Sequence, residues 1–244
     1  MGRAQLAIHS KSDALCDSNT LTSATPENLP MLEASAVERI RPTTVIMTNQ
    51  SERAIVGLSV KWTYIDESGK SLVHTHSSDS YAIRNSNVVL APYSRLLIAP
   101  GVFLPESLMQ KPHVGPGLES LDGRDSPAAT TASQITVQID CLIFEDGQVV
   151  GPNESHYDAE ILGRKTAAEQ IAQQVRSAQV RGQEPAQVLH ELLEHSLPQP
   201  DFTSSWMKRY ARKLLKAPVF ERQLAALEAM PKLPAFYTRK EGKQ

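Results

Sequence analysis

The stretch AIVGLSVKWTYI, residues 54–65, decides the fold. Its large apolar side chains fall on every second residue, so an extended chain places them on one face and the small or polar residues on the other. The apolar face consists of Val56, Leu58, Val60, Trp62 and Tyr64. This period of two predicts a β-strand with one buried face, on which Trp62 fills the space between two packed sheets.

Turn residues connect this strand to its neighbours. Asp66–Lys70 is a short connection that contains glycine, which predicts that residues 71–83 return as an antiparallel partner. Further strands are predicted at residues 44–49, 88–90 and 93–98 from their content of β-branched and large apolar residues.

A second alternating segment lies near the middle of the chain. Asp146-Gly147 follows it and is a typical two-residue hairpin turn, leading into Val149 and Val150. A regular strand would bury Cys141 as an unreactive thiol and would turn Asp140 to the opposite face, with no evident partner. The predicted core face of this strand holds Ile135, Val137, Ile139, Cys141 and Ile143.

Beyond Gly151-Pro152-Asn153 the apolar residues recur at intervals of three and four, which is the helical period. Residues 153–230 are therefore predicted to hold about four helices. They are one over residues 154–181 that stops at Gly182, one opening at Pro185, one capped by Ser204 and Ser205, and one opening at Pro218.

Three segments lack such patterns. Residues 1–39 are rich in Ser, Thr, Asn and Ala without a sustained period, which predicts a disordered leader. The segment at about 105–133 is rich in proline and glycine and predicts a long flexible loop. The basic tail, residues 231–244, is predicted to fray.

The predicted fold is mixed α+β, with the two kinds of structure segregated along the chain. Residues 40–152 are predicted to form an N-terminal antiparallel β-sandwich of immunoglobulin or fibronectin type, and a C-terminal helical region follows. The only cysteines are Cys16 and Cys141, so the disulfide of antibody domains is missing.

Residues 139–153, where a strand and an acidic-glycine hairpin lead into a Gly-Pro boundary, resemble part of a known kind of module. The resemblance is to fibronectin-like or immunoglobulin-like modules of uncharacterised bacterial proteins, and it extends over about residues 40–155 on generic turn and strand features. It implies a role in binding or spacing rather than catalysis, and it transfers no functional residue.

The charge is distributed unevenly. Residues 1–203 hold 15 basic against 24 acidic residues, a net charge of −9, whereas residues 204–244 hold 10 against 3, a net charge of +7. No uninterrupted apolar run reaches the roughly 18 residues of a membrane span, so no transmembrane segment is expected. The sequence as written begins without a secretory signal, which indicates the cytoplasm; an upstream start would permit an extracytoplasmic location, so the compartment stays undecided.

The positive charge is concentrated in one predicted amphipathic helix, residues 204–217. Either this helix binds an anionic membrane or a nucleic acid, or its cations form a solvated face or pair with the acidic remainder of the chain. The second situation is the more common for a packed amphipathic helix. The candidate binding residues are Trp206, Lys208, Arg209, Arg212, Lys213 and Lys216.

His74 and His76 lie two apart on a predicted strand, so their imidazoles share a face, and such a pair is a candidate for two of the ligands of a zinc site. No third ligand has a suitable spacing, and with Leu72 and Ser78 they are predicted to form a solvated strand face. The sequence also lacks a nucleophile elbow, a phosphate-binding loop and a dinucleotide fingerprint. We therefore assign no catalytic, cofactor-binding or metal-binding residue.

The leading hypothesis is a non-enzymatic interaction or structural protein whose β-sandwich binds a protein partner that the sequence does not identify. The alternative is a peripheral binder of anionic lipid or nucleic acid through residues 204–217. A metal-dependent enzyme using His74 and His76 is a minor third hypothesis.

Overall fold

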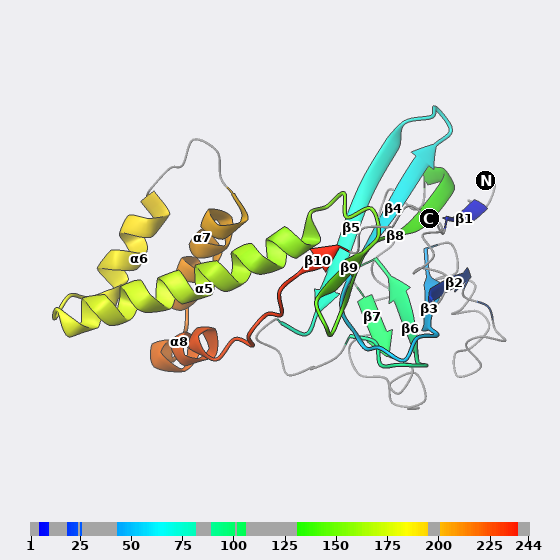
Figure 1. Cartoon of the computed structure of the whole chain (residues 1–244). Helices are drawn as coiled ribbons and strands as arrows, with labels where there is room; N and C mark the ends of the chain where they lie inside the picture. The colour runs from blue at the N-terminus through cyan, green and yellow to red at the C-terminus, as the bar shows by residue number, and fades with distance from the viewer. Residues whose placement is uncertain are drawn as a thin grey trace. The chain divides into compact units, whose positions relative to one another are not determined.

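In the computed structural model of the chain, the strands and helices gather into two compact units (Figure 1). One unit holds the strands, and the other consists mainly of the helices within His156–Phe236. The prediction of a mixed α+β fold is confirmed. The structure describes residues 5–9, 19–23, 25, 43–81, 89–100, 102–105, 131–194 and 201–238.

The larger sheet is built around β4 (Ile55–Asp66). β5 (Ser71–Asp79) pairs with it antiparallel after the predicted turn, and β8 (Ala132–Phe144) pairs antiparallel on its other side. Asp66 tightens the turn, because its carboxylate accepts hydrogen bonds from the N–H groups of Ser68 and Lys70, both at 2.9 Å. β4 is therefore a central strand, with a neighbour on each side.

Three short strands extend this sheet beyond β8. β9 (Gln148–Val150) follows the predicted Asp146-Gly147 turn and pairs antiparallel with β8. β1 (Gln5–His9) pairs parallel with β8, and β10 (Tyr237–Thr238) pairs parallel with β9. The sheet thus recruits segments from near both ends of the sequence.

The smaller sheet is antiparallel throughout and has the order β2-β3-β6-β7. Its strands are β2 (Asn19–Ser23), β3 (Val45–Asn49), β6 (Arg95–Ala99) and β7 (Val102–Pro105). The predicted strand at residues 88–90 is replaced by an isolated bridge between Leu90 and Ile55.

The structure corrects the predictions for both ends of the chain. β1 and β2 lie within residues 1–39, predicted as a disordered leader, and β10 lies within residues 231–244, predicted to fray. Each is at most five residues long and is placed by backbone hydrogen bonds, so its side chains need no period that a sequence would show. Most of the remaining leader, residues 106–130 of the predicted loop and the last residues of the tail lie outside the described part of the chain.

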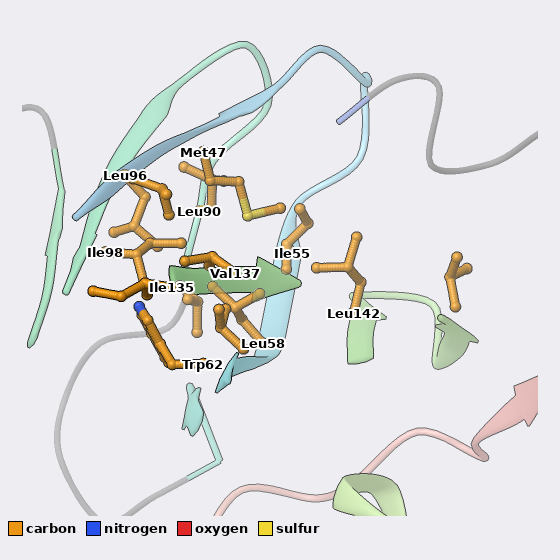
Figure 2. Close-up of a cluster of buried hydrophobic side chains, with 14 of the residues drawn as sticks. Met47, Ile55, Leu58, Trp62, Leu90, Leu96, Ile98, Ile135, Val137 and Leu142 are labelled. Carbon is orange, nitrogen blue, oxygen red and sulfur yellow. The ribbon is translucent and has the colours of Figure 1, made fainter. Parts of the chain in front are cut away.

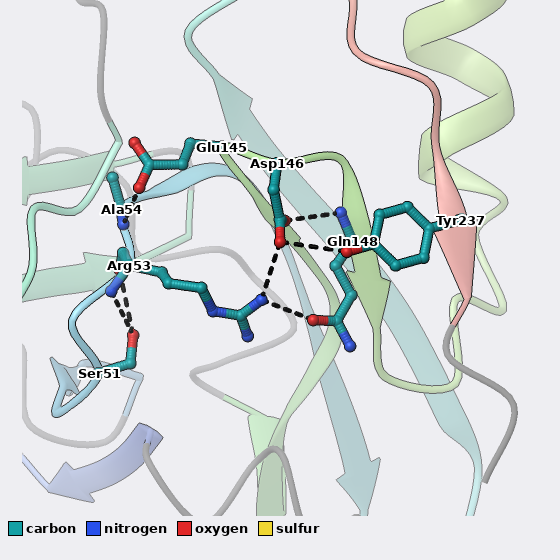
Figure 3. Close-up of polar contacts among 7 residues, drawn as sticks. All are labelled: Ser51, Arg53, Ala54, Glu145, Asp146, Gln148 and Tyr237. Carbon is teal, nitrogen blue, oxygen red and sulfur yellow. Dashed lines mark hydrogen bonds and ion pairs between the residues drawn. The ribbon is translucent and has the colours of Figure 1, made fainter. Parts of the chain in front are cut away.

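β10 is held at the sheet by Tyr237 (Figure 3). Its N–H donates to the Gly147 carbonyl and its hydroxyl donates to Asp146 Oδ2, both at 3.1 Å. Burial alone would raise the pKa of Asp146, but hydrogen bonds from the Gln148 N–H, the Tyr237 hydroxyl and Arg53 outweigh it and hold the pKa below its usual value. Asp146 is therefore ionised at neutral pH and binds β10 to the turn between β8 and β9.

Side chains from both sheets meet in one hydrophobic core (Figure 2). Trp62 is fully buried in this core, as predicted, and its indole N–H donates to the Thr43 carbonyl at 2.9 Å. The largest fully buried residues of this core are Met47, Ile55, Leu58, Trp62, Leu96, Ile98, Ile135, Leu142 and Phe144. Because both sheets supply them, the two sheets stabilise each other.

Tyr64 places a hydroxyl in this core that finds no hydrogen-bond partner among the described residues. The side chain is 3% exposed, and burial raises its pKa to about 12. An unsatisfied buried hydroxyl destabilises the folded state, so we expect Tyr64→Phe to leave the free energy of unfolding unchanged or to raise it by up to about 1 kcal/mol. Urea unfolding of the two proteins measures this, and a loss above about 1 kcal/mol would show that the hydroxyl is hydrogen-bonded in solution.

A β-bulge at Asp140 corrects the predicted face of β8. Ser59 pairs with Cys141 and Val60 pairs with Ile139, so Asp140 is an extra residue in the ladder. The alternation changes sides there, and Leu142 and Phe144, rather than Cys141 and Ile143, join the core between the sheets. Cys141 is nevertheless buried, as predicted.

Asp140 also has partners that the alternation did not indicate. Its Oδ2 accepts from the Ser59 hydroxyl at 3.2 Å and from the N–H and hydroxyl of Ser155, and its Oδ1 accepts from the Glu154 N–H at 2.9 Å. Its own carbonyl accepts from the Asn153 N–H at 2.7 Å. Asp140 therefore fixes the segment that leads from β9 to the first helix.

The helical unit is held together by its own hydrophobic core. Its helices are α5 (Tyr157–Val180), α6 (Pro185–Glu194), α7 (Phe202–Leu215) and α8 (Phe220–Glu228). All four contribute buried apolar side chains to one cluster, which is separate from the core of the sheets. Gly163 permits α5 to approach α7 closely, because a Cβ there would lie 2.6 Å from Phe202 Cβ.

An exposed ion-pair network ties α8 to α5. Arg176 of α5 donates to Glu221 Oε2 and to Glu228 Oε1, each at 2.8 Å, and Gln179 Nε2 donates to Glu221 Oε1 at 2.7 Å. The hydrogen bond from Gln179, followed by that from Arg176, lowers the pKa of Glu221; Arg176 does the same for Glu228. Both carboxylates are thus ionised and engaged within the helical unit.

These lowered pKa values predict a stability that depends on pH. Because the pKa of each glutamate is lower in the folded state, protonation shifts the equilibrium toward the unfolded state. The network therefore stabilises the folded state fully above the unfolded glutamate pKa of about 4.3, and this stabilisation is lost as pH falls through the lower folded pKa values. We expect Arg176→Met to lower the midpoint of thermal unfolding slightly at pH 7 and much less at pH 3, as followed by circular dichroism. An equal difference at both pH values would contradict the network's role.

Candidate anion-binding surface

The helix that carries the candidate cations begins earlier than predicted. Asp201, not Ser204 or Ser205, is its N-cap, because the Asp201 carboxylate accepts from the Ser204 N–H at 2.7 Å. Ser204 and Ser205 lie in the first turn of α7. The predicted basic segment 204–217 is therefore the body of α7 and the two residues that follow it.

The apolar face of α7 is already occupied. Tyr210, Ala211 and Leu214 are at most 4% exposed and pack in the core of the helical unit. Met207 packs against the same core. The face that an interfacial helix would bury in a bilayer is thus used for folding.

The cations gather on the outward side of the same helix. At about 100° per residue, the five side chains between Lys208 and Lys216 span an arc of about 140° around the axis. Four of them are exposed, namely Arg209, Arg212, Lys213 and Lys216. We call these four residues the α7 basic face.

The basic face has no acidic partner in the part of the chain that the structure describes: none of its four side chains makes an ion pair or a hydrogen bond there. The two acids nearest in sequence are engaged elsewhere, Asp201 as the N-cap of α7 and Glu221 with Arg176. The alternative to an anionic partner was that the cations form a solvated face or pair with the acidic remainder of the chain. Such pairing is not seen among the described residues, and the four side chains are exposed.

Lys208 differs from the four exposed cations. It is half-buried and lines a groove of about 360 Å³ between α5, α6 and α7. Val188, Leu192 and Met207 make the groove largely apolar. Lys208 therefore lies at the margin of the basic face rather than in it.

Trp206 contacts one cation of the α7 basic face. Its half-buried ring packs against the helical core and beside Tyr210. The Arg209 guanidinium lies 4.5 Å from the ring centroid and that of Arg164, from α5, lies 5.4 Å away. Trp206 thus supports Arg209 through a cation–π contact. Arg164 was missed from the sequence because nothing in the period of α5 links it to Trp206.

The structure also corrects the face predicted for the two histidines. His74 and His76 are half-buried and lie on the core side of the sheet, with edge-on ring contacts to Tyr64 at 5.7 Å and to Trp62 at 5.5 Å. Leu72, which was predicted to share a solvated face with them, is 49% exposed. Pairing with β4 sets this orientation, because directly opposed residues share a face. Among the described residues, no group of three or more His, Cys, Asp or Glu is arranged to hold a metal ion.

Comparisons with known proteins add no assignment: no family model, no curated protein and no solved structure matches the chain. None of the described helices combines the length and the apolar character needed to cross a membrane. Among the described residues, the α7 basic face is the feature whose chemistry points most directly to a partner.

Proposed function

We propose that the protein is a non-enzymatic binding protein whose helical unit holds a polyanionic partner through the α7 basic face. One observation carries the proposal. Four exposed cations lie together on one helix, and no acidic group compensates them within the described residues. Like charges held together repel one another, and a polyanion relieves that repulsion.

Retention on immobilised heparin, a generic polyanion, tests this function. The double variant Arg209→Gln/Lys213→Gln should elute at a clearly lower salt concentration than the unchanged chain, because exposed cations act through screened electrostatics. The matched control is Lys70→Gln/Arg181→Gln, which removes two exposed cations elsewhere and should elute with the unchanged chain. Equal shifts in both variants would show that only net charge matters and would overturn the proposal.

A second candidate function is protein binding by the two-sheet unit, which we propose to be an immunoglobulin- or fibronectin-type sandwich. It is supported by β5, an edge strand whose only partner among the described strands is β4. β5 exposes Leu72 and Val73, at 49% and 53%, and contains no Lys, Arg or Pro to discourage pairing. An added strand from a partner protein fits such an edge.

The edge is tested by sedimentation over a range of concentrations. If β5 accepts a strand, the unchanged chain should self-associate at high concentration, and Val73→Lys should suppress this because charged residues block edges. A monomer at every concentration for both proteins would count against pairing at this edge.

Metal analysis of the purified protein addresses the third hypothesis, an enzyme with a metal at His74 and His76, and a stoichiometric ion would revive it.

A further inference from the structure

We propose that the polyanion bound by the α7 basic face is the phosphate backbone of a nucleic acid, held without readout of base sequence. This inference rests on the proposed function and names its partner. It chooses between the two anionic partners that the charge of α7 permits, a nucleic acid and a membrane.

Burial of the apolar face of α7 argues against a membrane. A helix that lies in a bilayer interface inserts its apolar side chains, but Tyr210, Ala211 and Leu214 are buried in the helical core. Only electrostatic attraction remains, and four cations alone give a dissociation constant of about 1 mM for an anionic membrane. Stable attachment to a bilayer requires a second signal, which the described part of α7 does not supply.

The spacing of the cations suits a phosphodiester backbone. Arg209 and Lys216 are seven residues apart, a rise of about 10 Å along the helix. On each strand of duplex DNA the phosphates are ~3.4 Å apart along the helix axis, so the same length holds about three phosphates per strand. Four phosphate contacts therefore require the α7 basic face to reach both strands, as a helix that lies across a groove does.

Arg209 is the best placed of these cations. Its guanidinium is held against the Trp206 ring, 4.5 Å from the centroid, so part of the side chain is ordered before binding. Arginine donates in a fork that matches two phosphate oxygens, which makes an ordered guanidinium a stronger ligand than a mobile one. Trp206 is then a positioning residue, which acts through Arg209 rather than by stacking on bases.

The chemistry of the face predicts sequence-independent binding. Every exposed residue between Lys208 and Lys216 is Lys or Arg, and none is the Asn or Gln that pairs with adenine. Arg and Lys can also pair with guanine, so the comparison of duplexes rich in A·T and in G·C tests whether these cations contact phosphates alone. Phosphate contacts fix position but carry no sequence information directly. Affinity for A·T-rich and G·C-rich duplexes should therefore agree within a few-fold.

The salt dependence of binding tests the inference quantitatively. With four phosphate contacts, the logarithm of the association constant for a mixed-sequence DNA duplex should fall with the logarithm of salt concentration with a slope of about −3.6. Arg209→Gln/Lys213→Gln should reduce the slope to about −1.8 and weaken binding about 60-fold at 0.1 M salt. Lys70→Gln/Arg181→Gln should leave both values unchanged, and Arg209→Lys/Lys213→Arg should retain the slope. Fluorescence anisotropy of a labelled duplex measures all four proteins.

A parallel titration with phosphatidylserine-containing vesicles separates the outcomes. DNA binding that depends on the basic face, with weak vesicle binding, supports the inference. Vesicle binding that depends on the basic face without DNA binding overturns the inference and leaves the proposed function standing. DNA binding equal in the unchanged chain and in Arg209→Gln/Lys213→Gln overturns the inference. Failure to bind heparin, DNA or vesicles overturns both.

Discussion

Asp140→Ala should lower the free energy of unfolding of the two-sheet unit by about 3–5 kcal/mol. The carboxylate is 1% exposed and accepts hydrogen bonds from Ser59, Glu154 and Ser155. Hydrogen bonds to a charged group contribute about 1.5–3 kcal/mol each, and removal of the acceptor leaves several donors without a partner. The loss of two or three such bonds, reduced by local relaxation, gives the expected range.

The measurement is urea unfolding followed by tryptophan fluorescence in a Trp206→Phe background, where Trp62 alone reports on the core of the sheets. Glu154→Ala is the matched control. It removes a carboxylate from the same segment, but that carboxylate is exposed and, among the described residues, pairs only with Lys61, so the cost should be below about 1 kcal/mol. Equal costs for the two variants would show that the hydrogen bonds of Asp140 do not hold the segment.

The bulge at Asp140 also shows where prediction from alternation fails. A period of two assumes an unbroken ladder, and it identified β4 because that strand has one face in the core over most of its length. In β8 the ladder shifts where the main chain and side chain of Asp140 bind residues 153–155. This shift depends on contacts with residues distant in sequence, so no local pattern announces it.

The short strands and the basic face illustrate the same limit in different ways. β1, β2 and β10 pair through their backbones, which leaves no period in the side chains, and the contact of Tyr237 in β10 with Asp146 joins residues far apart in sequence. The cations of α7 were identifiable from sequence, but their lack of an acidic partner was not. That property depends on how the helices pack, which also sets the pairing of Arg176 on α5 with the acids of α8. The sequence therefore indicated the positive charge of α7, and the tertiary structure determines whether these cations can bind an anionic partner.

Gly151→Ala should destabilise the two-sheet unit by about 3 kcal/mol or more. Gly151 follows β9 with φ +108°, a conformation that side-chain-bearing residues rarely adopt. A Cβ there would also lie 2.6 Å from the carbonyl oxygen of Asp140 and 3.4 Å from Cys141 Cα. These are backbone atoms of the bulge, which cannot move aside as the end of a flexible side chain can. The conformational strain at positive φ and the steric overlap of the new Cβ therefore both contribute to the loss of stability.

Gly69→Ala separates the two causes. Gly69 has φ +83°, but a Cβ there meets nothing within 4 Å, so only the conformational cost of about 1 kcal/mol should appear. The difference between the two variants in urea unfolding then measures the close approach of the chain at Gly151 to the bulge. If both variants cost the same, the contact with the Asp140 carbonyl does not constrain this position. A markedly larger cost at Gly151 means that the bulge requires glycine there, and that the hydrogen bonds of Asp140 and the close approach of the backbone at Gly151 stabilise one junction together.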